Sequence, residues 1–191
     1  MSSQVEICNL AIGKLGSTSF ITDINDENSK NALYCRLFYG PTRDALLRSH
    51  LWKFARKRAV LAPLVEEPLF DGGKYFQLPT DCLRVVGADE DYFHNYGRWF
   101  VEGNKIVADT DVLNIVYIAK IEDESLYDPL FVQAFALYLA HEMAPAIAQS
   151  ESMKGNLSNE MQAAIIRAAH AGSTEQDGQA FISEVFLRAH N

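Results

Sequence analysis

The chain has 191 residues, 48% of them hydrophobic and 22% charged, and carries a net charge of −8. This composition is typical of a folded protein and excludes an intrinsically disordered one, and the length allows one core, or one core with a small second domain. The three cysteines are too few and too scattered for a disulfide framework or a CxxC metal site, which favours buried thiols in a reducing compartment. No secretory signal is expected at the start of the sequence.

Two helices are predicted in the first fifty residues. Residues 4–15 place apolar side chains on one face of a short helix, which Gly16 would end. A longer helical pattern covers residues 28–51, and Asp26 or Asn28 can cap its start. Pro41 lies inside this pattern, where it removes one intrahelical hydrogen bond, so we expect a bend there.

The helical period is lost after residue 51. Residues 52–61 combine Trp52 and Phe54 with several cations, and we predict a strand there. The cations of this stretch and of the preceding turn are Arg48, Lys53, Arg56, Lys57 and Arg58. Three interpretations are open: a solvated or salt-bridged strand, a subunit interface in which the cations meet acidic residues of a neighbour, and direct contact with DNA. The functional assignment for these five residues is the subunit interface.

Strand patterns replace helical ones in the middle of the chain. The predicted strands span residues 74–78, 83–87, 99–102, 105–108 and 112–118. Gly72-Gly73 and Gly103-Asn104 separate strands, and the second pair is typical of a two-residue hairpin turn. A small antiparallel sheet is therefore predicted. Fourteen acidic and five basic residues lie between residues 64 and 128, so acidic charge is concentrated in this segment.

The helical period returns near residue 128. Asp128 is a capping carboxylate, and Pro129 suits the first position of a helix. Residues 129–150 are apolar on nearly all sides, but their polar interruptions favour a helix buried in protein over a membrane span. Pro145 would kink or end this helix, and a further helix is predicted over residues 157–172.

The end of the chain carries large apolar side chains that so short a segment cannot bury by itself. The side chains predicted to dock on a partner are Phe181, Ile182, Val185, Phe186, Leu187 and Arg188. The sequence thus predicts an α+β fold: mainly an α-helical bundle with an inserted small antiparallel β-sheet domain and an extended C-terminal tail. The predicted bundle takes residues 1–63 and 128–172, the β segment residues 64–127, and the docking tail residues 173–191.

Motifs for catalysis, metal binding and nucleotide binding are incomplete. His141-Glu142 matches the start of a zincin HExxH motif, but Pro145 stands where the second histidine belongs. The acidic clusters at residues 89–91 and 122–124 leave open, as an alternative function, a tail-associated hydrolase of cell-wall or capsule glycan that uses two carboxylates. There is no GxSxG motif and no complete phosphate-binding loop. The prediction is therefore a protein that is not an enzyme, with no catalytic residue, cofactor or metal.

Several short motifs, in order, resemble one protein family. They are Asp44-Ala45-Leu46-Leu47-Arg48, His50, Trp52, Phe54-Ala55, Arg58, Leu78-Pro79-Thr80-Asp81-Cys82-Leu83-Arg84-Val85, Trp99, Val101-Glu102-Gly103, Tyr117 and Asp128-Pro129-Leu130-Phe131. With the opening Ile7-Cys8-Asn9-Leu10-Ala11, this pattern is similar to the tail tubular protein A family, the head-to-tail adaptors, or head completion proteins, of short-tailed bacteriophages. The resemblance covers nearly the whole chain.

The resemblance implies a structural protein of the virion neck, made in the cytoplasm of the bacterial host. Members form a ring, commonly dodecameric, on the portal protein and above the tail nozzle protein. Double-stranded DNA passes through the ring without specific binding, and no membrane is involved. The helices and the C-terminal tail would hold the portal, and the sheet segment would face the next tail component.

Overall fold

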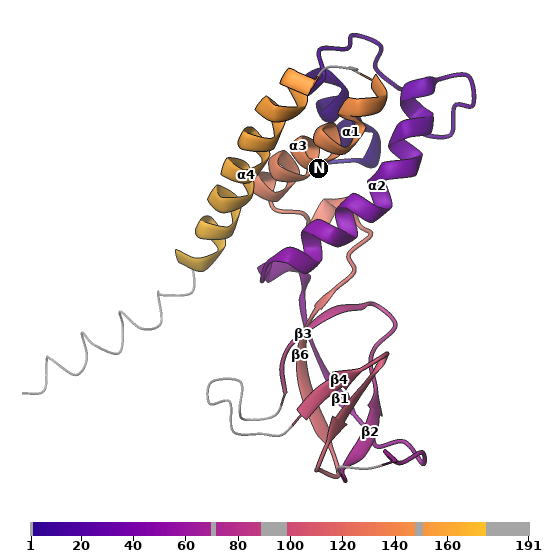
Figure 1. Ribbon diagram of the computed structural model, residues 1–191, viewed down its shortest axis with the longest axis vertical. Coiled ribbons are helices and arrows are strands. Elements are labelled where there is room, and N and C mark those ends of the chain that lie inside the picture. Colours follow the sequence, from indigo (N-terminus) through magenta and orange to yellow (C-terminus); the bar gives the residue numbers. More distant parts are fainter. Residues whose placement is uncertain (1, 70–71, 89–98, 148–150, 175–191) are drawn as a thin grey trace, which may run out of the picture. The chain divides into compact units, whose positions relative to one another are not determined.

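The computed structural model describes residues 2–69, 72–88, 99–147 and 151–174, and over these residues it is an α+β fold of four α-helices and six antiparallel β-strands (Figure 1). The chain divides into two compact units. Residues 1–46 and 123–191 form one, here called the helical unit, and residues 47–122 form the other, the inserted unit. The inserted unit begins earlier than the predicted β segment, because the strand after residue 55 pairs within its sheet.

Helix α1 (Gln4–Lys14) has a capping box at its start. The Ser3 hydroxyl accepts a hydrogen bond from the Glu6 amide at 3.2 Å, and the Glu6 carboxylate accepts one from the Ser3 amide at 2.9 Å. Just beyond the helix, Gly16 has a φ of +72°, a conformation that favours glycine. The predicted first helix and its glycine stop are thus confirmed.

Helix α2 (Lys30–Ser49) begins one residue after Ser29, whose hydroxyl accepts a hydrogen bond from the Ala32 amide at 3.2 Å. The predicted caps were wrong, since the Asp26 carboxylate instead accepts from the Asn28 amide at 2.9 Å in a local turn before the helix. Pro41 lies inside the helix, and Figure 1 shows α2 changing direction along its length, as expected for an internal proline.

Helix α3 (Pro129–Ile147) forms the core of the helical unit and packs against α1 and α4 (Glu151–Thr174). The Asp128 carboxylate caps it, accepting hydrogen bonds from the amides of Leu130 at 2.8 Å and Phe131 at 3.3 Å. Ten of its residues are buried: Phe131, Val132, Ala134, Phe135, Ala136, Leu137, Leu139, Ala140, Met143 and Ala144. Within the described ranges, α3 alone is long and apolar enough to cross a membrane, but this extensive burial is also typical of a core helix.

The two later helix boundaries differ from the predicted ones. Pro145 does not end α3, which continues to Ile147. Helix α4 starts at Glu151, well before the predicted residue 157, and extends past residue 172. Its early residues, including Gly155, are too polar to show the apolar period by which the helix was predicted.

The inserted unit contains two three-stranded sheets where one had been predicted. In the first sheet, β6 (Leu113–Ala119) lies between β1 (Arg56–Leu61) and β3 (Cys82–Ala88). In the second, β5 (Lys105–Ala108) lies between β2 (Lys74–Gln77) and β4 (Trp99–Glu102). The single-sheet prediction was wrong because strand patterns are local, whereas the choice of partner strand is not.

Both sheets have a central strand that contributes to the core of the inserted unit. Strand β6 buries Leu113, Ile115 and Tyr117 on one of its faces, and β5 buries Ile106 to Ala108. The hairpin β4–β5 turns at Gly103, whose φ is +61°, and pairs Glu102 with Lys105. This two-residue turn is the one predicted from the Gly-Asn pair.

Candidate interaction surfaces

The five predicted interface cations lie on three different elements. Arg48 lies in the last turn of α2 and donates a hydrogen bond to the Leu83 carbonyl. Lys53 lies in the short 3-10 helix η1 (Lys53–Ala55), and the other three lie on β1. Trp52, which directly precedes Lys53, is buried, with an exposed fraction of 5%. The aromatic side chain therefore points into the unit, while the cations that follow occupy an edge strand.

Strand alternation separates the three cations of β1. Lys57 pairs with Tyr117 in the register of the sheet, whereas Arg56 pairs with Ile118, and Arg58 lies on the same face as Arg56. On the other side of β6, Ile118 pairs with Arg84 of β3, so a third arginine lies on the same face as Arg56 and Arg58. Sequence reasoning missed Arg84 because the register between strands distant in sequence cannot be read from local pattern.

On the other face, Lys57 belongs to a small polar network. Its Nζ lies 2.8 Å from Oδ2 of Asp81, and the Tyr117 hydroxyl donates to Oδ1 of the same carboxylate at 3.1 Å. Burial raises the pKa of Asp81, but the hydrogen bonds from Lys57 and Tyr117 outweigh burial and hold that pKa below its usual value. Burial, followed by the hydrogen bond to the Asp81 carboxylate, raises the pKa of Tyr117 to about 12. Lys57 thus serves the fold of its own sheet.

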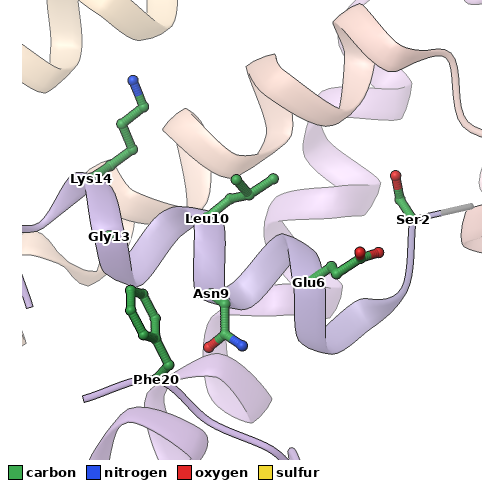
Figure 2. Close-up of a pocket in the computed structure, with 7 residues that line it drawn as sticks. All are labelled: Ser2, Glu6, Asn9, Leu10, Gly13, Lys14 and Phe20. Atoms are coloured by element: carbon green, nitrogen blue, oxygen red, sulfur yellow. The ribbon is translucent and has the colours of Figure 1, made fainter. Parts of the chain in front are cut away.

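A second surface lies in the helical unit, where a loop closes against α1. The Asn9 side chain donates to the Ile21 carbonyl at 2.8 Å and accepts from the Ile21 amide at 2.9 Å. A neighbouring turn of this loop is held by Asn31, whose side chain donates to the Ser19 carbonyl at 2.8 Å. These bonds pin Phe20, which lies between Ser19 and Ile21, beside α1 (Figure 2).

Between this loop and α1 lies an open groove of about 830 Å³, lined by Ser2, Glu6, Asn9, Leu10, Gly13, Lys14 and Phe20. Figure 2 shows the Phe20 ring next to Gly13, and a Cβ at that position would lie 3.7 Å from the ring. Leu10 and Phe20 are 50% and 58% exposed. The Glu6 side chain is engaged in the helix cap, so the groove offers mainly apolar surface. Such a groove suits an apolar side chain of a partner better than catalysis.

The buried polar groups of the helical unit link its own elements. The buried Tyr39 on α2 donates to Oε1 of Glu124 at 3.1 Å, in the 3-10 helix η3 (Glu124–Leu126) before α3. Burial is the main reason that the pKa of Tyr39 lies above its usual value. Cys35 contacts Met143 of α3 at 4.0 Å between sulfur atoms and lies near Cys8 of α1, whose pKa it raises. These contacts join the helices of the unit.

Two facing carboxylates, as a glycan hydrolase needs, are found in none of the three cavities described here. A cavity of about 680 Å³ in the inserted unit is lined by Arg48 and Arg84 among neutral residues, and one of about 480 Å³ contains Asp109 as its acid. The acidic cluster at residues 89–91 lies outside the described residues. Across the described ranges, no group of three or more His, Cys, Asp or Glu residues could hold a metal ion.

The predicted docking residues of the tail also lie outside the described residues: Phe181, Ile182, Val185, Phe186, Leu187 and Arg188. The structure therefore leaves their role as a prediction from sequence. A search of protein-family models finds none that matches this chain, and a search of curated proteins also finds no match.

Proposed function

We propose that this chain is a structural head-to-tail adaptor of a short-tailed bacteriophage, forming a ring between the portal protein and the tail nozzle protein. The observation that carries the proposal is the ordered set of motifs, from residues 7–11 to residues 128–131, that resembles the tail tubular protein A family. In this role the fold is a helical bundle with an inserted sheet domain and a C-terminal docking tail.

The division of the chain into two units supports a bridging role. An adaptor has to present separate surfaces to the particle components above and below it. The helical unit exposes Leu10 and Phe20 at the groove beside α1, and the inserted unit exposes Phe100 and Val101 on β4. Exposed apolar side chains of this kind are typical anchors at protein interfaces. We assign the helical unit and the tail to the portal and the inserted unit to the next tail component.

The tail supplies the strongest anchors in this assignment. Phe181, Ile182, Val185, Phe186 and Leu187 place large apolar side chains within seven positions. Arg188 follows them and can pair with an acidic group of the portal. DNA passes through the ring without specific binding, since a chain of net charge −8 provides little general attraction to phosphates.

Binding to the portal tests this proposal. Full-length protein mixed with its portal should give an added ring at the portal in negative-stain images, and the chain lacking residues 179–191 should fold but no longer bind. A control variant, Val65→Ser at an exposed side chain of the inserted unit, should bind as the wild type does. Retained binding by the truncated chain would remove the tail from the mechanism. A wild-type chain that never binds the portal, or that clears a glycan zymogram, would overturn the adaptor assignment.

A further inference from the structure

Three arginines share one face of the first sheet in the inserted unit. Arg56 and Arg84 flank Ile118 from the two edge strands, and Arg58 follows two residues after Arg56 on the same face. Arg58 and Arg84 are exposed, and Arg56 is half-buried. Within the described part of the chain, none of the three guanidinium groups makes an ion pair. We call Arg56, Arg58 and Arg84 the arginine face.

The same unit has an acidic corner, defined by Glu67, Asp109 and Asp111. All three residues are exposed, and they surround a single cation, Lys74. Lys74 forms an ion pair with Asp111, and the nearby charges of Asp109 and Glu67 act on it more weakly. Three carboxylates around one ammonium group leave an excess of negative charge at this corner.

The arginine face and the acidic corner cannot neutralise each other within one copy. Asp111 lies just before the start of β6, whereas Arg56 and Arg84 flank Ile118 near its end. The nearest of the three arginines, Arg58, lies opposite Val116, five residues after Asp111, which corresponds to at most about 17 Å along the strand direction. This distance is well beyond the Debye length of about 8 Å at physiological ionic strength. Both surfaces therefore keep their charge for a partner.

We propose that the arginine face of one copy docks on the acidic corner of a second copy. Arginine forms bidentate hydrogen bonds with carboxylates, and two different surfaces of one chain make a head-to-tail contact that closes into a ring or continues as a filament. Each surface also has an exposed apolar neighbour to bury: Val60, 72% exposed, follows Arg58 on its face, and Val112, 51% exposed, follows Asp111. This contact rests on the ring part of the proposed function and names the residues that would join its subunits.

Charge complementarity favours a second copy over duplex DNA. The arginine face is small, and the whole chain is strongly acidic, so phosphate contacts would have to overcome the repulsion of the remaining surface. Two copies also repel each other through their net charge, but their contact buries the exposed apolar side chains Val60 and Val112, which a phosphate backbone would leave exposed. Binding of duplex DNA through the arginine face would therefore contradict the contact.

The test uses two variants of the full chain that each remove one surface. Arg58→Glu with Arg84→Glu reverses the exposed part of the arginine face, and Glu67→Lys with Asp109→Lys reverses the acidic corner. Arg36→Glu with Arg167→Glu, both exposed in the helical unit, is the control with the same charge change as the arginine variant. Circular dichroism and tryptophan fluorescence identify variants that remain folded.

Sedimentation at about 0.01 M salt, where the Debye length is about 30 Å, should show concentration-dependent association of the wild type and of the control. Each surface variant alone should associate at least about tenfold more weakly. A mixture of the two variants should recover association, because the two intact surfaces are complementary in charge and so are the two reversed surfaces.

Three results would overturn this contact. The first is a wild type that remains monomeric up to about 1 mM, which would mean a dissociation constant weaker than that concentration. The second is a mixture of the two variants that does not associate. The third is duplex DNA that binds the wild type but not the arginine variant. Portal binding is measured separately. A chain that self-associates but does not bind the portal would refute the adaptor function and would not contradict this contact.

Discussion

Removing the Asp81 carboxylate should destabilise the inserted unit by about 1.5–4 kcal/mol. The Tyr117 hydroxyl, on a side chain only 5% exposed, would lose a charged acceptor, which costs about 1.5–3 kcal/mol. The ion pair with Lys57 adds at most about 1 kcal/mol, because both partners are substantially exposed. Asp81→Asn keeps an acceptor for Tyr117 and should cost about 1 kcal/mol. The free energy of unfolding should therefore be highest for the wild type, lower for Asp81→Asn and lowest for Asp81→Ala.

Tryptophan fluorescence during urea unfolding measures this effect selectively. The chain has two tryptophans, Trp52 and Trp99, and both lie in the inserted unit, whereas far-ultraviolet circular dichroism reports mainly the helices. Asp81→Ala should lower the fluorescence midpoint by about 1 M urea or more, given typical slopes for small domains. The control is Asp109→Ala, an exposed aspartate with no hydrogen bond of its own in the described chain, which should change stability by less than about 0.5 kcal/mol. Equal shifts for the two alanine variants would refute the reasoning.

The same network predicts a pH dependence. Because the pKa of Asp81 is lower in the folded than in the unfolded chain, its contribution is complete above the unfolded pKa and is lost as the pH falls through the folded value. The stability difference between the wild type and Asp81→Asn should therefore shrink below about pH 4. A difference that stays constant down to pH 2 would contradict the carboxylate's role.

Three further predictions concern other parts of the fold. Native protein should react with a thiol reagent first at Cys82, which is half-buried, and much more slowly at the buried Cys8 and Cys35; equal rates measured by mass spectrometry would contradict the packing. Gly73→Ala should destabilise the inserted unit by about 1–3 kcal/mol, since φ is +86° and a Cβ would lie 3.1 Å from the Ala108 carbonyl oxygen, whereas Gly103→Ala, with open space around it, should cost less by the same fluorescence assay. Phe135→Ala in α3 should cost about 3–5 kcal/mol in the unfolding of the helices followed by circular dichroism, and Phe20→Ala at the exposed groove should cost under about 1 kcal/mol; a reversal of this order would refute the assignment of the core.

Local signals in the sequence predicted most of the elements. These signals act over a few residues, so they can be recognised without knowledge of the tertiary structure. Examples are the capping carboxylate of Asp128, the helix stop at Gly16 and the hairpin turn at Gly103. The caps of α2 were misassigned among three neighbouring polar residues, because Asp26 and Ser29 both form local hydrogen bonds and only one of them starts the helix.

Features that depend on strand pairing could not be predicted in this way. The division into two sheets and the position of Arg84 beside Ile118 follow from register between distant segments. Lys57 was grouped with Arg56 and Arg58 as one cationic block, although alternation along β1 sends it to the opposite face, toward Asp81. The apolar groove was missed because it depends on the Asn9 side chain reaching Ile21, twelve residues away.

The pairing of β1 with β6 has a consequence for how this protein can change over evolution. These are the strands through which the chain enters and leaves the inserted unit, and Arg56 lies directly opposite Ile118, so the two ends of the insertion are only about 5 Å apart between paired Cα atoms. A module whose ends meet in this way can be deleted, replaced by a short linker or exchanged for another module without stretching the polypeptide that receives it. Recombination can thus give the same helical unit a different inserted unit.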